Sequence, residues 1–125
     1  MPHTILEYSK EAGVVACEVN DFLAEMHVAL AATNIVELAR IKGRSLVHDN
    51  VVVGAGVADK NNFIFLQIAM LEGRTVDERV KIAAQAQAVL LRWITRWNIE
   101  PEISVTIEVR EMQSATHKRL ERKIP

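Results

Sequence analysis

Two segments of this chain, residues 2–47 and 63–112, carry the same order of strand, helix and strand, and this repetition constrains the fold more than any other feature. The first strand of each segment, at residues 3–8 and 63–71, is apolar on both faces, which is typical of a strand inside a sheet. A strand–helix–strand crossover places its two strands parallel and its helix on one face of the sheet. The chain is therefore predicted to be α+β, with a four-stranded sheet and two helices on one face.

Helical periodicity fills the middle of both segments. Residues 16–32 carry apolar side chains three or four positions apart, which predicts an amphipathic helix. Asn34, which tolerates the left-handed conformation, is expected just past its end. A second helix is predicted over residues 76–97, where Thr75 and Glu78 have the spacing of a capping box. Its two tryptophans are expected in the core or in a contact between subunits.

The remaining segments differ in how strongly they resemble strands. Residues 103–110 alternate between apolar and polar side chains, and residues 39–47 are predicted to form the strand that completes the first segment. Residues 51–57 are predicted to form a short strand that ends in a glycine turn. Residues 114–125 form a basic tail, which is expected to be mobile and solvated. Because the sheet face without helices carries many apolar side chains, we expect an oligomer to cover it.

Composition limits the partners of the chain. Its 125 residues are 50% hydrophobic and 25% charged, as expected of one globular domain with its own core. The 15 Lys and Arg residues against 16 Asp and Glu residues give a net charge of -1, which predicts neither nucleic acid nor an anionic membrane as a partner. No stretch resembles a signal peptide or a membrane span. We therefore expect a soluble cytoplasmic protein.

Cysteine and histidine show no pattern of a metal site. The single cysteine excludes an intramolecular disulfide and fits a reducing compartment. Because Cys17 lies among valines, it is expected to be a buried, inert thiol. The histidines have no ligand spacing with one another or with Cys17; they are His3, His27, His48 and His117. No metal or other cofactor is expected.

Three cations fall on alternate positions of the strand predicted at residues 39–47. Arg40, Lys42 and Arg44 are expected to share one face of that strand, because side chains two positions apart point the same way. Two interpretations remain open at this point. The charges either protect a solvated sheet edge from aggregation, or hold an anion such as a carboxylate in place.

The beginning of the chain carries another unusual feature. If Met1 is removed, Pro2 becomes a free secondary amine at the start of a strand. A free α-amino group titrates near ~8 in model peptides, so partial burial or a nearby cation can leave it unprotonated and basic at neutral pH. Alternatively, Pro2 only opens the strand, which is one of the places where strands tolerate proline.

Several stretches together resemble one enzyme family. They are Met1-Pro2-His3, Leu30 to Ile35, Leu38 to Arg44, Glu72 to Thr75 and Glu111-Met112. In these stretches the chain resembles the 5-carboxymethyl-2-hydroxymuconate isomerase family, and its second half also resembles 4-oxalocrotonate tautomerase. Both belong to the tautomerase superfamily, whose members use an N-terminal proline as a base. The resemblance implies one tautomerase-like domain over residues 1–125, a homotrimer, and an enol-to-ketone isomerisation in the breakdown of an aromatic acid.

The resemblance also implies roles for five residues. Pro2 matches the catalytic amine, and Arg74 matches an arginine that binds a substrate carboxylate. Lys42 and Arg44 fall on two arginines of the isomerase, and Arg40 falls on the strand arginine of the short tautomerases. The implied partner is a small carboxylate substrate such as 5-carboxymethyl-2-hydroxymuconate. Lysine at position 42 keeps the charge but lacks the bidentate fork with which arginine fits a carboxylate.

Two alternatives stay open beside the isomerase. Other proline-based relatives hydrate, dehalogenate or decarboxylate small acids, and activation of a water usually needs a carboxylate beside the amine, for which Glu7 and Glu108 are candidates. The second alternative is a non-catalytic trimeric binding protein. Retention of Met1 would favour it, because Pro2 would then carry an amide nitrogen that is not basic.

Overall fold

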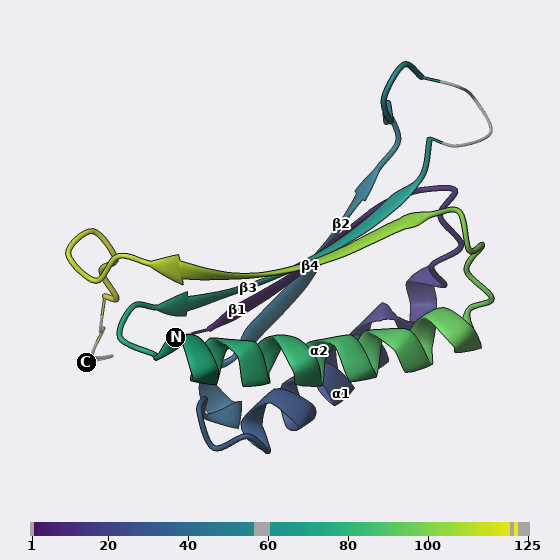
Figure 1. Cartoon of the computed structure of the whole chain (residues 1–125). Helices are drawn as coiled ribbons and strands as arrows, with labels where there is room; N and C mark the ends of the chain where they lie inside the picture. Colours follow the sequence, from purple (N-terminus) through teal and green to yellow (C-terminus); the bar gives the residue numbers. More distant parts are fainter. Residues whose placement is uncertain (1, 57–60, 121, 123–125) are drawn as a thin grey trace.

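The computed structural model describes residues 2–56, 61–120 and 122, which form one four-stranded sheet with two helices on one face (Figure 1). The strands are β1 (His3–Ser9), β2 (Lys42–His48), β3 (Phe63–Leu71) and β4 (Ser104–Met112), and the helices are α1 (Val19–Ala31) and α2 (Val76–Arg96). One-turn 3₁₀ helices at Ala16–Glu18 and Leu38–Arg40 precede α1 and β2. The predicted α+β fold with two repeats is confirmed.

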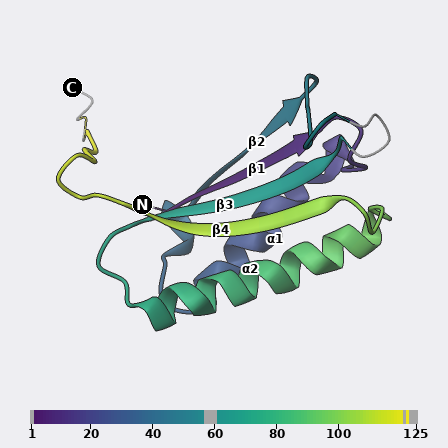
Figure 2. The ribbon, with the colours of Figure 1, turned by 45° about the horizontal axis from the view of Figure 1, so that its top comes forward.

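The order of strands shows how the two repeats join. The sheet runs β2-β1-β3-β4, with β1 parallel to β2 and β3 parallel to β4. β1 and β3 are antiparallel neighbours at the centre, where Leu6 lies opposite Leu66. Each crossover therefore pairs its own two strands, and the repeats meet along their first strands. The two helices pack against each other on the same face of the sheet (Figure 2).

The core lies between the sheet and the helices. Leu6 of β1 and Leu66 of β3 point to the helices and are fully buried. Phe22 of α1 contacts Trp93 of α2 and Trp97 just past the end of α2, with ring centroids 5.9 and 5.6 Å from that of Phe22. Complete burial of a side chain such as Phe22 stabilises the fold by about 1.5–3 kcal/mol. The two tryptophans are therefore core residues that join the helices.

The sequence prediction for the start of α2 is confirmed in atomic detail. Glu78 N donates to Thr75 Oγ1 at 3.1 Å, and Thr75 N donates to Glu78 Oε1 at 3.0 Å, which is a complete capping box. These bonds satisfy amides that have no partner within the helix. They fix the point at which the chain turns from β3 into α2.

Three local predictions are wrong. β2 begins at Lys42 rather than at residue 39, because the preceding turn is closed by a hydrogen bond from Ile41 N to Leu38 O at 3.2 Å. Residues 51–56 form no strand, and residue 57 of that prediction lies outside the described residues. Cys17 is exposed rather than buried, because it lies in the 3₁₀ turn before the apolar stripe of α1 begins.

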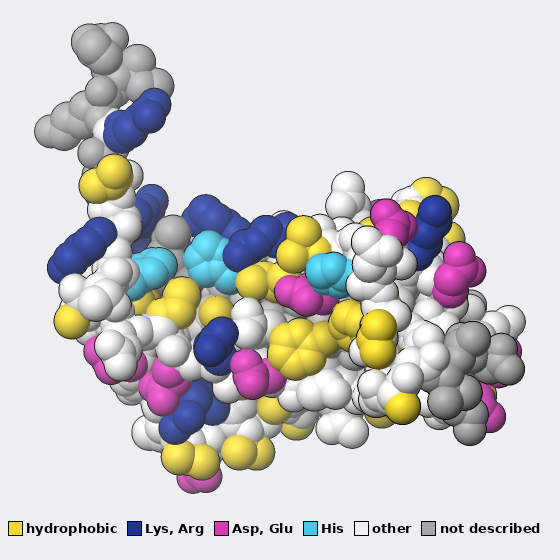
Figure 3. All heavy atoms as spheres, turned by 90° about the horizontal axis from the view of Figure 1, so that it is seen from above, with side chains coloured by type: hydrophobic (Ala, Val, Ile, Leu, Met, Phe, Trp, Pro, Cys, Tyr) yellow, Lys and Arg dark blue, Asp and Glu magenta, His cyan; other side chains and the backbone are white. Residues whose placement is uncertain are grey.

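The sheet face opposite the helices, called the open face below, is not covered by either helix (Figure 3). It carries His3, Ile5, Glu7, Lys42, Arg44, Leu46, His48, Phe65, Gln67, Thr106, Glu108 and Arg110. Apolar and charged side chains are therefore mixed on it, and Lys, Arg and His side chains gather at the end beside the C-terminal segment (Figure 3).

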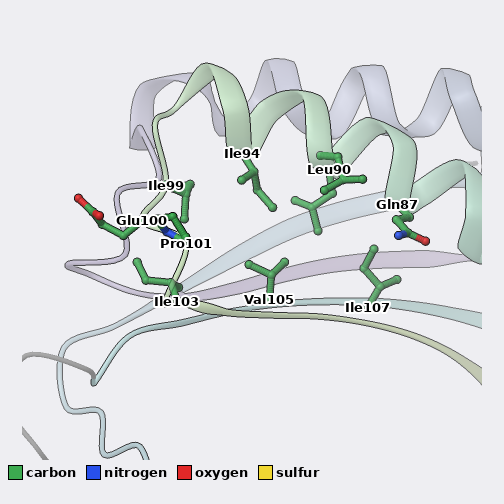
Figure 4. A pocket seen from close by; sticks show the side chains of 10 residues that line it. Gln87, Leu90, Ile94, Ile99, Glu100, Pro101, Ile103, Val105 and Ile107 are labelled. Atoms are coloured by element: carbon green, nitrogen blue, oxygen red, sulfur yellow. The ribbon is translucent and has the colours of Figure 1, made fainter.

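The two edge strands pack differently on the helices. A groove of about 560 Å³ separates β4 from the second half of α2, and Leu90, Ile94 and Val105 are among its mainly apolar lining (Figure 4). By contrast β2 lies close to α1, because a Cβ at Gly43 would lie only 2.7 Å from His27 Nε2. The first repeat is thus closed tightly at its edge, and the second is not.

The described start of the C-terminal tail folds back onto the sheet. The backbone amide and the hydroxyl of Ser114 donate to Glu72 Oε1 at 3.0 and 2.7 Å. The His117 ring then lies 6.5 Å from the His3 ring, measured between centroids. Ser114 and His117 thus contact one end of the sheet, while all residues from 113 to 120 except His117 are exposed, as the prediction of a solvated segment requires.

Candidate active site

A cavity lies where β1 begins and β3 ends. Its volume is about 450 Å³. The residues that line it are Pro2, Asn34, Ile35, Val36, Glu37, Arg40, Leu71 and Arg74. The first repeat supplies the start of β1 and the loop after α1, and the second repeat supplies the end of β3. The cavity therefore needs both repeats.

Pro2 is buried and immediately precedes β1. Its carbonyl oxygen accepts a hydrogen bond from Lys42 N at 3.1 Å, which ties it to the start of β2. Proline fits here because a strand tolerates it at its first position, where no backbone N–H is needed for the ladder. Met1, whose removal would free the amine of Pro2, lies outside the described residues.

Arg74 reaches the cavity from the turn after β3. Gly73 precedes it with φ 114°, a conformation that favours glycine and redirects the chain after the strand. The guanidinium then donates from Nη1 to Leu71 O at 3.2 Å and from Nη2 to Ile35 O at 3.4 Å. These two carbonyl groups come from different repeats, so they fix the orientation of Arg74 across the join.

Arg40 also lines the cavity, but not from the strand on which the sequence placed it. It ends the 3₁₀ turn Leu38–Arg40, and its Nε lies 2.9 Å from Glu37 Oε2. Both side chains are more than half exposed, and such surface pairs contribute only about 0–1 kcal/mol to stability. The prediction that Arg40 shares a strand face with Lys42 is wrong, because strand alternation begins only at Lys42.

Lys42 and Arg44 lie on the open face, and neither lines the cavity that contains Pro2. Lys42 is the register partner of His3, and Arg44 Nη1 lies 3.1 Å from His3 Nδ1. Partial burial lowers the pKa of His3 below its usual value of 6.5, and the charges of Arg44, Lys42 and His117 lower it further. The structure thus divides the predicted substrate-binding cations into two groups.

The two carboxylates suggested as partners of the amine lie elsewhere. Glu7 Oε2 is 3.3 Å from His48 Nε2 on the open face, and Glu108 Oε1 accepts from Gln67 Nε2 at 3.3 Å on the same face. Neither lines the cavity of Pro2. Glu37 does, and the sequence analysis missed it. Its spacing of three residues from Arg40 was the available signal, which the prediction of a strand from residue 39 concealed.

The described residues offer no arrangement for a resident metal. Nowhere in residues 2–56, 61–120 and 122 do three His, Cys, Asp or Glu side chains gather in a way that could hold an ion. In the same ranges no helix combines the length and the apolar character needed to cross a bilayer. The charged groups that line the cavity of Pro2 are instead the guanidinium groups of Arg40 and Arg74 and the carboxylate of Glu37.

Comparison with known proteins identifies the family. A family model described as 5-carboxymethyl-2-hydroxymuconate isomerase matches residues 2–122. The chain belongs to the 5-carboxymethyl-2-hydroxymuconate isomerase family. A search of curated proteins finds no match. A crystal structure of a 5-carboxymethyl-2-hydroxymuconate isomerase from Deinococcus radiodurans R1 is 17% identical with a TM-score of 0.82, covering 97% of this chain and 90% of that one.

Two further solved structures share the fold of this isomerase family. One is a 5-carboxymethyl-2-hydroxymuconate delta-isomerase, 15% identical with a TM-score of 0.67, covering 98% of this chain and 89% of that chain. The other is Pt0534 inactivated by 2-oxo-3-pentynoate, 17% identical with a TM-score of 0.68, covering 94% of this chain and 91% of that chain. At these identities the likeness establishes the tautomerase fold, and the activity is argued from the cavity.

Proposed function

We propose that this chain is a tautomerase that converts the enol of an unsaturated 2-hydroxy di- or tricarboxylate, such as 5-carboxymethyl-2-hydroxymuconate, to its 2-oxo isomer. The reaction belongs to the breakdown of an aromatic acid in the cytoplasm. The observation that carries the proposal is the cavity in which Pro2 lies with Arg40 and Arg74. A base and two cations are what an enol with flanking carboxylates requires.

Pro2 acts as the proton carrier once Met1 has been removed. Its secondary amine takes the proton of the enol hydroxyl, the electrons of the O–H bond form the carbonyl, and the conjugated double bond shifts. The same nitrogen then delivers the proton to the distant carbon, so that one O–H bond is broken and one C–H bond is formed. Burial and two nearby guanidinium groups both favour the unprotonated amine, which is the form that can accept the proton.

Arg74 and Arg40 hold the substrate and stabilise the dienolate. A guanidinium has five N–H donors, and two of those of Arg74 are used in the bonds to Leu71 and Ile35. These bonds orient the others before substrate arrives, which is the condition for effective electrostatic stabilisation of developing charge. Arg40 can add a second charge-assisted contact to a carboxylate.

We further propose that three copies of the chain assemble and cover the open face. Ile5, Leu46 and Phe65 of that face are apolar, and Leu46 is 49% exposed in the single chain. The proposal that Lys42 and Arg44 also bind substrate then means that they serve the cavity of a neighbouring copy, because they point away from the Pro2 cavity of their own chain.

Glu37 supports a second candidate, a proline-based hydratase. Its carboxylate lines the cavity that also contains Pro2, which gives an acid-base pair able to activate a water. Water then adds across a carbon–carbon multiple bond conjugated to an acid, with hydroxyl on one carbon and a proton on the other. The ion pair with Arg40 opposes this role, because it already engages Glu37.

The first test follows the ultraviolet absorbance of 5-carboxymethyl-2-hydroxymuconate with protein shown by intact mass to lack Met1. We expect fast ketonisation that falls about 10²- to 10⁴-fold in Pro2→Ala, the range that a positioned acid-base group contributes. Arg92→Ala is the control for a lost surface arginine, since Arg92 lies on α2 and lines no part of the cavity. Processed protein that adds nothing to the spontaneous rate would exclude the isomerase and leave the binding protein.

The alkynone 2-oxo-3-pentynoate separates the two reactions. If Pro2 is a free amine, it adds to the triple bond and the N-terminal peptide gains the mass of the reagent, as expected for the isomerase. If Pro2 and Glu37 activate water, the reagent is instead hydrated to a diketone and the protein keeps its mass. We expect the adduct in both wild type and Glu37→Gln; turnover of the reagent that Glu37→Gln abolishes would establish the hydratase.

A further inference from the structure

The two guanidinium groups of the candidate active site differ in their partners. Arg74 donates to Leu71 O and Ile35 O, which are neutral carbonyl groups. Arg40 Nε instead lies 2.9 Å from Glu37 Oε2, and this carboxylate lines the same cavity. Among the ion pairs found in the described part of the chain, none involves Arg74. The uncompensated positive charge of the cavity therefore lies at Arg74.

The loop after α1 fixes the positions of Glu37 and Arg40 relative to each other. Val36 is buried next to Glu37 and anchors the loop in the core. The 3₁₀ turn follows, and Arg40 N donates to Glu37 O at 3.0 Å. In such a turn, side chains three positions apart lie nearly one above the other. The backbone thus brings the carboxylate and the guanidinium together at the cavity.

Stability does not account for the pair of Glu37 and Arg40. The side chain of Glu37 is 74% exposed and that of Arg40 is 55% exposed, and exposed pairs contribute little to the free energy of unfolding. The carboxylate does change the charge that a bound molecule meets. An anion about 4 Å from both groups is repelled by Glu37 about as strongly as it is attracted by Arg40. The pair therefore offers an anion almost no net attraction.

The cavity is thus unlike at its two cations. A substrate carboxylate at Arg74 meets a positive charge that no carboxylate of the described residues offsets. A substrate group at Arg40 meets a neutral pair that both donates and accepts hydrogen bonds. An uncharged group suits this second position better than a carboxylate, because only the carboxylate is repelled by Glu37.

We propose that Glu37 is a specificity-determining residue, which restricts the cavity to 2-hydroxydienoates that place one carboxylate at Arg74 and an uncharged group at Arg40. A di- or tricarboxylate is then accepted only with its other carboxylates turned away from Arg40. The inference rests on the proposed function for the kind of substrate, and it gives Glu37 a role other than the activation of water.

The first experiment compares two enols that differ only in their far group. 2-Hydroxymuconate ends in a carboxylate, and 2-hydroxyhexa-2,4-dienoate ends in a methyl group. The quantity measured is kcat/KM for the dicarboxylate divided by kcat/KM for the monocarboxylate, from ultraviolet absorbance with protein that lacks Met1. Because both enols are tested on the same preparation, poor folding of a variant cancels in this ratio.

Changes of charge at the pair should move the ratio in opposite directions. Glu37→Gln leaves Arg40 unmatched and should raise the ratio about tenfold, which is the scale of one charge–charge interaction near a protein surface. Arg40→Gln leaves Glu37 unmatched and should lower the ratio by a similar factor. The double variant Glu37→Gln/Arg40→Gln restores neutrality and should return the ratio to within about twofold of the wild type.

Asp49→Asn is the matched control for the lost carboxylate. It breaks an exposed ion pair with Lys10 and changes the net charge by the same amount, but Asp49 does not line the cavity of Pro2. Its ratio should equal that of the wild type. A ratio that Glu37→Gln leaves unchanged, or that Asp49→Asn raises as much, would overturn the proposal.

The second experiment separates this inference from the proposed function. Amide NMR follows titrations with adipate and hexanoate, which are saturated acids of equal length with two carboxylates and one, so no turnover is needed. We expect Glu37→Gln to strengthen adipate binding about tenfold relative to hexanoate. If the isomerase assay fails but this shift is seen, the reaction is wrong and the selective role of Glu37 stands. If both enols are ketonised but neither ratio moves, the isomerase stands and the role of Glu37 is refuted.

Discussion

The two ends of the central strand pair carry cavities of different character. At one end β1 begins at Pro2 and β3 runs out into Arg74, with a cavity of about 450 Å³. At the other end β1 runs out at Ser9 and β3 begins after Asn62, with a cavity of about 230 Å³. Because β1 and β3 are antiparallel, each cavity lies where one of these strands begins and the other ends. The first cavity is completed by the loop after α1, and the second by the end of β2 and the residues after it, so the two cavities differ in their surroundings as well as in their residues.

Hydrogen bonds of Ser9 join the end of β1 to the start of β3 at the second cavity. Phe63 N donates to Ser9 Oγ at 3.0 Å, and Ser9 Oγ donates to Asn62 Oδ1 at 2.8 Å. Its charged residues are Lys10, Glu11 and Asp49, and Lys10 lies 3.9 Å from Asp49. It therefore has a backbone amide where the first cavity has a proline, and one lysine with two carboxylates where the first has two guanidinium groups with one carboxylate. Only the first suits a base and a carboxylate.

The largest effect is expected when Met1 is retained, because the nitrogen of Pro2 is then an amide, like the backbone nitrogen of Phe63 at the second cavity. Protein that retains Met1 carries an amide at Pro2, and an amide nitrogen does not accept a proton at neutral pH. Its isomerase rate should fall at least about 10²-fold, as for loss of the acid-base group. The check is the rate of two preparations whose intact masses differ only by Met1. Equal rates would show that Pro2 is not the base.

The next effect compares one cation from each cavity. Arg74→Ala removes a guanidinium that two carbonyl groups orient, and should lower kcat/KM about 10- to 100-fold, because a charge-assisted contact to substrate is lost. Lys10→Ala removes an exposed cation from the second cavity and should leave kcat/KM unchanged. Steady-state kinetics with the enol substrate measures both. Equal losses in the two variants would mean that general charge, not the cavity, steers the substrate.

A third effect compares the two edge strands. At Gly43 a new Cβ would lie 2.7 Å from His27 Nε2 and 2.8 Å from Thr4 Oγ1, so Gly43→Ala overfills the space under α1. We expect a loss of about 1–3 kcal/mol in the free energy of unfolding. Val105→Ile adds a methylene beside the open groove of β4 and should change it by less than about 0.5 kcal/mol. Denaturant unfolding checks both, and equal costs would contradict the difference in packing.

Sequence patterns predicted most of the fold because each pattern depends on residues close together in the chain. The apolar runs of β1 and β3, the alternation in β4 and the apolar stripe of α2 each follow from one element and the core that it faces. The capping box was predicted to the residue because its two partners are three positions apart. The order of elements then left few possible topologies.

The candidate site was harder to predict, because it depends on where one element stops. The run from Leu38 to Arg44 alternates in charge like a strand, yet its first three residues form a 3₁₀ turn. That turn moves Arg40 to the cavity of Pro2 and brings Glu37 with it, while Lys42 stays on the open face. The spacing of residues 38–44 does not distinguish a strand from a 3₁₀ turn followed by a strand. The loop after α1 also contacts Arg74, which is distant in sequence, and local spacing carries no information on that contact.

The smallest expected effect is a pH dependence confined to the tightly packed first repeat. His27 Nε2 lies 2.6 Å from Thr4 Oγ1 under β2, and burial lowers the pKa of His27 from 6.5. The unfolded chain therefore binds this proton more tightly, so stability present above about pH 6.5 is lost as pH falls toward the folded pKa. His27→Gln should flatten this slope. His3, whose pKa is also lowered, contributes in the same direction, so His3→Gln serves as the comparison. An unfolding free energy that changes with pH equally in wild type and His27→Gln would contradict this assignment.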